Sequence, residues 1–138
     1  MYKLFYSPGT ASMVIHQLLI ELKQPFELVL VDFAAGQQKS AEFLQLNPQG
    51  RVPVLVDAEV SIYESAAILL YLTEKHQALT PPPVTKARAL FLQQIAFLTN
   101  NLAPQFRLWF YSPDLGFDEY PLALKQQLQQ NIASIWQQ

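Results

Sequence analysis

The run Pro81-Pro82-Pro83 constrains the fold of this chain more than any other feature. Each proline fixes its own φ angle and lacks a backbone N–H, so the run is stiff and no helix can continue through it. Strand-like and helix-like segments alternate before the run, whereas only helix-like segments follow it. We therefore expect two domains, residues 1–78 and 84–138, joined by a linker at residues 79–83.

Residues 1–78 alternate between segments typical of strands and segments typical of helices. The strand-like segments are apolar and rich in aromatic or β-branched residues, and turn residues separate them from the helical ones. The expected elements are strand 2–6, helix 10–23, buried strand 26–32, helix 41–46, a hairpin of strands 54–56 and 60–62, and helix 65–76. This β-α-β-α-β-β-α order predicts an α/β sandwich in which a parallel strand pair is extended by an antiparallel hairpin.

Beyond the prolines the pattern is helical throughout. Two apolar stripes predict two helices, the first carrying Leu92, Ile95, Ala96 and Leu102 and the second Leu124, Leu128, Ile132 and Ile135. Pro104 should kink or end the first of these helices, because proline cannot donate the helical hydrogen bond. The aromatic-rich residues 106–111 are more typical of a packed helix end than of a strand.

Composition excludes several functions. With 51% hydrophobic residues the 138-residue chain can bury a core, and its net charge of −2 disfavours nucleic acid and anionic membranes as partners. The lack of cysteine excludes disulfides, thiolate metal sites and a cysteine nucleophile. No spacing typical of metal ligands occurs, so we expect no metal. We see neither a signal peptide nor an apolar run that could cross a bilayer, and expect a cytoplasmic protein.

The segment Asn47-Pro48-Gln49-Gly50-Arg51-Val52-Pro53 is typical of a tight turn that leads into a strand. A proline at the start of a strand, after such a turn, is a candidate for a cis peptide bond. We expect Pro53 to hold the backbone N–H and C=O of Val52 outward, unpaired within its own sheet. An extended peptide could then bind to Val52 by strand addition.

Glu64 and Ser65 supply a second anchor, at the start of the helix that follows the hairpin. A helix N-terminus has free N–H groups and partial positive charge, which suit an anion. Ser65 should therefore bind a carboxylate, while Glu64 can accept an ammonium group. The two anchors together predict a site for a small peptide that has a free amine and a free carboxylate.

The turn, the Glu64-Ser65 step, the predicted sandwich and the helical extension together resemble the glutathione transferase family. The resemblance covers nearly all of the first domain, and Ser7-Pro8-Gly9 is similar to the strand-to-helix turn of the bacterial beta and theta-like branches. It implies a thioredoxin-like first domain that binds glutathione. It also implies a detoxifying transferase that passes the glutathione thiolate to small hydrophobic electrophiles, with glutathione as co-substrate and no cofactor.

The resemblance also implies roles for individual residues. It assigns glutathione binding to Gln49, Arg51, Val52, Pro53, Glu64 and Ser65. Val52 would pair through its backbone with the cysteinyl part of glutathione, and Glu64 and Ser65 would hold the γ-glutamyl end. Gln49 or Lys39 would lie near the glycyl carboxylate.

Catalysis in this family depends on a hydroxyl or thiol near the first helix that lowers the pKa of the glutathione thiol, and the branches differ in the residue that provides it. In this chain Tyr6 lies near the position used by the tyrosine branch, and Thr10 matches the serine branch. Ala11 stands where the beta branch has cysteine, and Ser12 matches the serine that follows it. The candidates are therefore Ser12, Thr10 and Tyr6, with Ser12 slightly preferred over Thr10.

Simpler interpretations exist for these residues. Ser7, Thr10 and Ser12 would also serve as caps of the first helix, because serine and threonine are favoured there without any chemistry. A rival interpretation of the whole chain is a non-catalytic binding or protein-interaction module on the same fold, since fold does not determine function. The missing cysteine and the short helical domain favour that rival.

Family members carry several more helices beyond the point where residue 138 falls. The resemblance therefore implies that residues 84–138 form only part of the helical domain, with an incomplete electrophile pocket. A truncated product is our first interpretation, ahead of a naturally short member or a chain completed by a partner. The family's usual pairing leads us to expect a homodimer.

Overall fold

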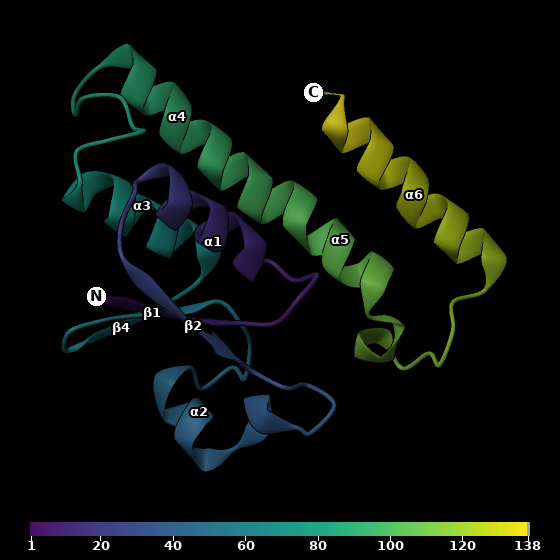
Figure 1. Ribbon diagram of the computed structural model, residues 1–138. Coiled ribbons are helices and arrows are strands. Elements are labelled where there is room, and N and C mark those ends of the chain that lie inside the picture. Colours follow the sequence, from purple (N-terminus) through teal and green to yellow (C-terminus); the bar gives the residue numbers. More distant parts are fainter. Residues whose placement is uncertain (138) are drawn as a thin grey trace. The chain divides into compact units, whose positions relative to one another are not determined.

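The computed structural model describes residues 1–137 of the chain, which divide into two compact units between Thr80 and Pro81. The first unit contains the only sheet of the described residues, and the second is helical (Figure 1). The division falls inside the segment where the prolines predict a linker. None of the helices in residues 1–137 is both long and apolar enough to span a membrane.

The sheet has four strands in the order β2-β1-β3-β4. They are β1 (Tyr2–Tyr6), β2 (Phe26–Leu30), β3 (Val54–Asp57) and β4 (Val60–Tyr63). β1 pairs in parallel with β2 and antiparallel with β3, and β3 forms an antiparallel hairpin with β4. This confirms the predicted sandwich, in which the antiparallel hairpin extends a parallel pair.

Helices cover both faces of the sheet (Figure 1). The helices α1 (Ser12–Glu21) and α3 (Ser65–Lys75) lie on one face, and α2 (Ala41–Leu46) lies on the other, after the short 3₁₀ turn η1 (Gln37–Lys39). Alternate residues of a strand point to opposite faces, so the sheet supports two apolar clusters. Leu4 and Leu55 pack with α1 and α3, whereas Val54 packs with Phe43 of α2.

The strand β2 differs from its prediction. An apolar run led us to expect a buried strand over residues 26–32, but β2 ends at Leu30 and forms an edge of the sheet. Leu28 and Leu30 are 37% and 54% exposed. A continuous apolar run does not distinguish a central strand from an edge strand, because the pattern says nothing about how many neighbours the strand has.

The second unit consists of helical segments. These are α4 (Lys86–Phe97), the π-helical segment η2 (Leu98–Leu102), α5 (Ala103–Phe110), the 3₁₀ segment η3 (Ser112–Leu115) and α6 (Leu122–Trp136). Leu102 and Leu128 are its most buried apolar residues among those described. The aromatic-rich residues 106–111 are helical up to Phe110, as predicted.

The helix is disrupted next to Pro104, as the sequence predicted, but the form of the disruption was not predicted. The chain keeps winding from α4 into α5, but it passes through the π-helical turn η2 directly before Pro104. In η2 the N–H of Ala103 donates to the carbonyl of Leu98, five residues back. A proline clashes with the carbonyl four residues before it and cannot donate to it, so a wider turn at this place agrees with the presence of Pro104.

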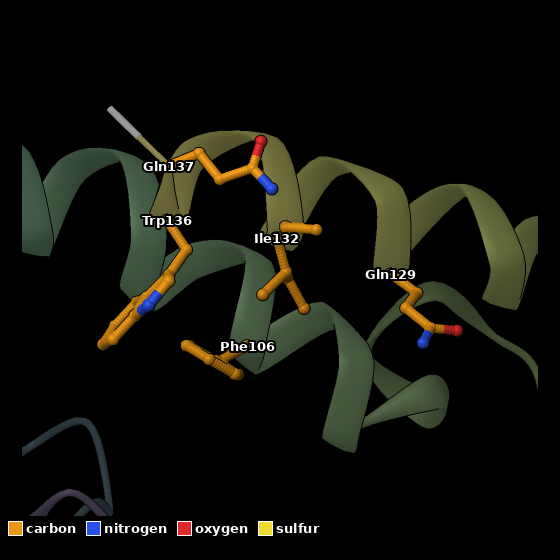
Figure 2. A pocket seen from close by; sticks show the side chains of 6 residues that line it. Phe106, Gln129, Ile132, Trp136 and Gln137 are labelled. Carbon is orange, nitrogen blue, oxygen red and sulfur yellow. The ribbon is translucent and has the colours of Figure 1, made fainter.

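A shallow apolar groove of about 410 Å³ lies between α5 and α6 of the second unit. Figure 2 shows Ile132 and Trp136 of α6 on the side that faces Phe106 of α5. Gln129, Ala133 and Gln137 also line the groove. Leu128 of the predicted stripe is buried and its other members are half-buried, whereas Trp136, which lies outside that stripe, is 71% exposed.

A polar cluster ties the end of β3 to the last turn of α3. The hydroxyl of Tyr71 donates to the carboxylate of Asp57 at 2.5 Å, and Lys75 donates to the same carboxylate. The hydrogen bonds from Lys75 and Tyr71 hold the pKa of Asp57 below its ordinary value. They also raise the pKa of Tyr71 and of Lys75, each through its contact with Asp57.

We expect Asp57→Asn to lower the free energy of unfolding at pH 7 and to have less effect at pH 3. A carboxylate whose folded pKa is depressed contributes fully above its unfolded pKa of about 3.9, and its contribution is lost as the pH falls through the folded value. Tyr71→Phe should cost about 1 kcal/mol at pH 7, because one hydrogen bond is removed. Urea unfolding at both pH values measures this; an Asp57→Asn loss that stays constant with pH would contradict it.

Candidate functional site

Asn47 organises the turn that leads into β3. Its side chain is buried, its Nδ2 donates to the carbonyl of Arg51 at 2.7 Å, and its Oδ1 accepts from the N–H of Gln49 at 3.0 Å. The N–H of Gly50 donates to the carbonyl of Asn47 at 2.9 Å. One side chain therefore holds the loop at two points. An asparagine before a Pro-x-Gly turn is a known signal for such bonds, and our sequence interpretation gave Asn47 no role.

Val52 follows this turn and offers free backbone groups. Its side chain packs against the cluster around Phe43 and Val54, so the residue is anchored on the inner side. The Val52–Pro53 peptide bond is cis, and Pro53 is buried. Within residues 1–137, no hydrogen bond uses the N–H or the C=O of Val52. These two groups can pair with an extended ligand, because β3 begins only at Val54.

The β3–β4 hairpin has the two anchors at the same end. Val54 of β3 is paired with Tyr63 of β4, so Val52 and Ser65 each lie two residues beyond the last pair of the hairpin. Ser65 is the first residue of α3, and its hydroxyl takes part in no hydrogen bond among the described residues. The N-terminus of this 11-residue helix carries partial positive charge. The two segments that sequence reasoning selected therefore adjoin the same end of the hairpin.

Glu64 has an uncommon backbone conformation. Its φ of 72° and ψ of 118° place it outside the helical and extended regions. Such positive φ values are costly for a residue with a Cβ, and they cluster at functional sites. The Glu64 side chain is exposed, and its carbonyl accepts the N–H of Ile68 at 3.0 Å. The carboxylate is thus available to a cation next to Ser65.

The hydroxyls of Thr10 and Ser12, at the start of α1, form a compact cluster around one carbonyl. Thr10 Oγ1 lies 2.7 Å from the carbonyl oxygen of Ser7, and Ser12 Oγ lies 3.1 Å from the same oxygen. The two hydroxyl oxygens are 2.7 Å apart. Ser12 is 1% exposed, whereas Thr10 is half-buried. The Ser7 carbonyl is a main-chain group, and no sequence signal pointed to its role.

The remaining candidates are placed differently. Tyr6 is half-buried and packs against the cluster beneath α1 and α3. Gln49, Arg51 and Lys39 are exposed around the turn and η1. The N-cap of α1 is Ala11, which has no capping side chain, although the Ser12 N–H lies 3.3 Å from Thr10 Oγ1. No group of three or more potential metal ligands comes together in residues 1–137.

Comparison with known proteins agrees with this geometry. The model of the glutathione S-transferase N-terminal domain matches residues 1–74. Glutathione S-transferase GST-4.5 of Xanthomonas campestris is 38% identical over 112 residues, which are 80% of this chain and 54% of that protein. The chain belongs to the glutathione S-transferase family.

Other relatives match with different coverage. Protein URE2 of Meyerozyma guilliermondii is 45% identical over 62 residues, which are 43% of this chain and 21% of that protein. The solved glutathione transferase URE2P8 of Phanerochaete chrysosporium superposes with a TM-score of 0.89 at 28% identity, covering 99% of this chain and 64% of that one. The chain spans about half the length of the Xanthomonas campestris relative.

We expect Gly50→Ala to destabilise the first unit more than Gly36→Ala does. Both glycines have positive φ, at 64° and 71°, so either substitution should cost about 1–2 kcal/mol in backbone strain. A Cβ at Gly50 would also lie 2.8 Å from the main-chain oxygen of Gln38, whereas a Cβ at Gly36 meets nothing within 4 Å. The extra cost at Gly50 should be about 1–3 kcal/mol, as for overpacking.

Urea unfolding of the two variants measures the difference. Gly36→Ala serves as the matched control because it shares the backbone conformation and lacks the close contact. Equal losses in the two variants would show that the turn can move away from η1.

Proposed function

We propose that this chain binds glutathione at Val52 and Ser65 and ionises its thiol for transfer to a small hydrophobic electrophile. The observation that supports the proposal is that the unpaired backbone of Val52 and the N-terminus of α3 lie just beyond the same end of the β3–β4 hairpin. Membership of the glutathione S-transferase family supports it. The solved relative URE2P8 was crystallised with oxidized glutathione, which supports the choice of ligand.

Glutathione suits the two anchors chemically. Its cysteinyl residue would take up both backbone hydrogen bonds of Val52, as in strand addition. Its γ-glutamyl carboxylate would lie at the α3 N-terminus with the Ser65 hydroxyl, where free N–H groups favour an anion. Its ammonium group would face Glu64. At the other end, Gln49, Arg51 and Lys39 are exposed and available for the glycyl carboxylate.

Thiol ionisation then needs a donor of moderate strength. An ordinary thiol has a pKa of about 8.5, and lowering it by about two units requires about 2.7 kcal/mol of preference for the thiolate. A charge-assisted hydrogen bond supplies about 1.5–3 kcal/mol, and the N-terminus of α1 adds up to about 1 kcal/mol. One hydroxyl next to that helix is therefore sufficient, and no cysteine of the protein is required.

Thr10 is the best placed of the three candidate donors. Ser12, which the sequence slightly favoured, is almost completely buried and turned toward the Ser7 carbonyl. Tyr6 packs beneath the helices and lies in β1 rather than at a helix N-terminus. Thr10 is only half-buried, and its hydroxyl also contacts the Ser7 carbonyl. We therefore propose Thr10 as the group that donates to the thiolate.

Further properties of the whole protein are also proposals. The family resemblance favours a homodimer, a cytoplasmic location and a role in detoxification. The mass of the native protein in solution tests the first of these. A mass equal to that of a single chain would contradict the dimer.

We expect glutathione to bind the chain, with Ser65→Ala raising the Kd about tenfold because one hydrogen bond to a charged group is lost. Cysteinylglycine lacks the γ-glutamyl group, so its weaker binding should be the same in the unaltered chain and in Ser65→Ala. Isothermal titration calorimetry provides both constants. Ser61→Ala is the matched control, since Ser61 lies on β4 and its hydroxyl donates to the Leu46 carbonyl, away from the proposed site. No detectable binding of glutathione would overturn the proposal.

A conjugation assay with a generic aromatic electrophile separates the enzyme from its rival. We expect turnover that rises with pH through the pKa of the bound thiol, because the thiolate is the nucleophile. Binding of glutathione without turnover would instead support a non-catalytic glutathione-binding module.

A further inference from the structure

The cluster formed by the Ser7 carbonyl and the hydroxyls of Thr10 and Ser12 has more hydrogen-bond contacts than it has protons to donate. Three oxygens, the Ser7 carbonyl, Thr10 Oγ1 and Ser12 Oγ, make three mutual contacts of 2.7, 3.1 and 2.7 Å. Each hydroxyl has one proton to donate and the carbonyl has none. One of the three contacts is therefore without a proton in every arrangement.

The distances indicate which contact that is. O–H···O hydrogen bonds are usually about 2.7–2.8 Å long, so both 2.7 Å contacts of Thr10 are expected to hold protons. In that arrangement Thr10 donates to the Ser7 carbonyl and accepts from Ser12. The 3.1 Å contact between Ser12 and the carbonyl is then the one left over. Ser12 thus retains a second acceptor within reach.

We propose that Ser12 is a positioning residue that releases the Thr10 proton for the bound thiolate. This inference rests on the proposed function. Ser7 is buried, and a buried carbonyl without a donor is costly. When Thr10 turns its proton toward a thiolate, Ser12 can turn its own proton to the Ser7 carbonyl, so that the carbonyl keeps a donor. Without Ser12, every hydrogen bond from Thr10 to the thiolate would leave that carbonyl unpaired.

The proton balance of the step is simple. The glutathione thiol loses its proton to solvent, and the S–H electron pair stays on sulfur. Thr10 keeps its O–H bond and donates a hydrogen bond to the sulfur. Ser12 also keeps its proton and changes only its acceptor, from Thr10 Oγ1 to the Ser7 carbonyl. The N–H of Ser12, 3.3 Å from Thr10 Oγ1, still contacts the donor oxygen.

The test measures the pKa of the bound thiol from the ultraviolet absorbance of the thiolate in saturating glutathione. We expect Ser12→Ala to raise that pKa by about one unit, which corresponds to one lost hydrogen-bond equivalent. Thr10→Ala should raise it further, by about two units. The double variant should match Thr10→Ala alone, because Ser12 acts only through Thr10. Thr10→Ser should leave the pKa near that of the unaltered chain.

Thr73→Val is the matched control for loss of a buried hydroxyl. Thr73 is as buried as Ser12, and its hydroxyl also lies within hydrogen-bond distance of two main-chain carbonyls, 2.9 Å from that of Leu69 and 3.1 Å from that of Leu70 in α3. It should lower stability without moving the thiol pKa, which separates positioning from general destabilisation. If Ser12→Ala does not fold, Ser12→Gly removes the same hydroxyl at the first helical position and should give the same shift.

The possible outcomes test the role of Ser12 and the proposed function separately. A thiol pKa that is unchanged in a folded Ser12 variant would overturn the inference and leave glutathione binding intact. Additive shifts in the double variant, or a larger shift for Ser12→Ala than for Thr10→Ala, would make Ser12 the direct donor and would also overturn it. If the unaltered chain does not bind glutathione, the proposed function falls and the inference falls with it.

Discussion

The pairing of β3 with β4 is the constraint on which the candidate site depends. A slip of one residue would turn every side chain of β3 to the opposite face, and it would change where Val52 lies relative to Ser65. Val54 and Leu55 resist such a slip because both are fully buried, on opposite faces of the sheet. The contacts of Asp57 with α3 add a polar requirement at the far end of the strand.

The site lies where regular structure stops, and that is why it has free groups to offer. Val52 precedes the first residue of β3, and Ser65 is the first residue of α3, so neither has its full set of backbone partners. The same position has a cost, because Glu64 adopts a backbone conformation that is unfavourable by about 1–3 kcal/mol. The buried contacts of Ile68 and Leu72 in the helix that follows offset it.

Much of the first unit could be predicted because its signals are local. β1 and α2 occupy the expected residues 2–6 and 41–46, and the hairpin forms around the expected turn. The edge position of β2 could not be predicted, since it depends on which strands pair, and that is decided by contacts distant in sequence. The π-helical turn before Pro104 was likewise out of reach, because a proline signals a disruption without specifying how the backbone relieves it.

The hydroxyls of Thr10 and Ser12 also have some properties that the local sequence predicts and others that it does not. Sequence alone predicted that Thr10 and Ser12 would lie near a helix N-terminus, but the exposure of each depends on the direction in which the turn enters the helix. With Ala11 between them, one hydroxyl is buried and the other is half-exposed, and both reach the Ser7 carbonyl. A neutral hydroxyl has a single proton, so its strength as a donor depends on what else competes for that proton. The chemistry of such a site therefore depends on both hydroxyls and on the carbonyl that they share, rather than on the residue nearest the ligand alone.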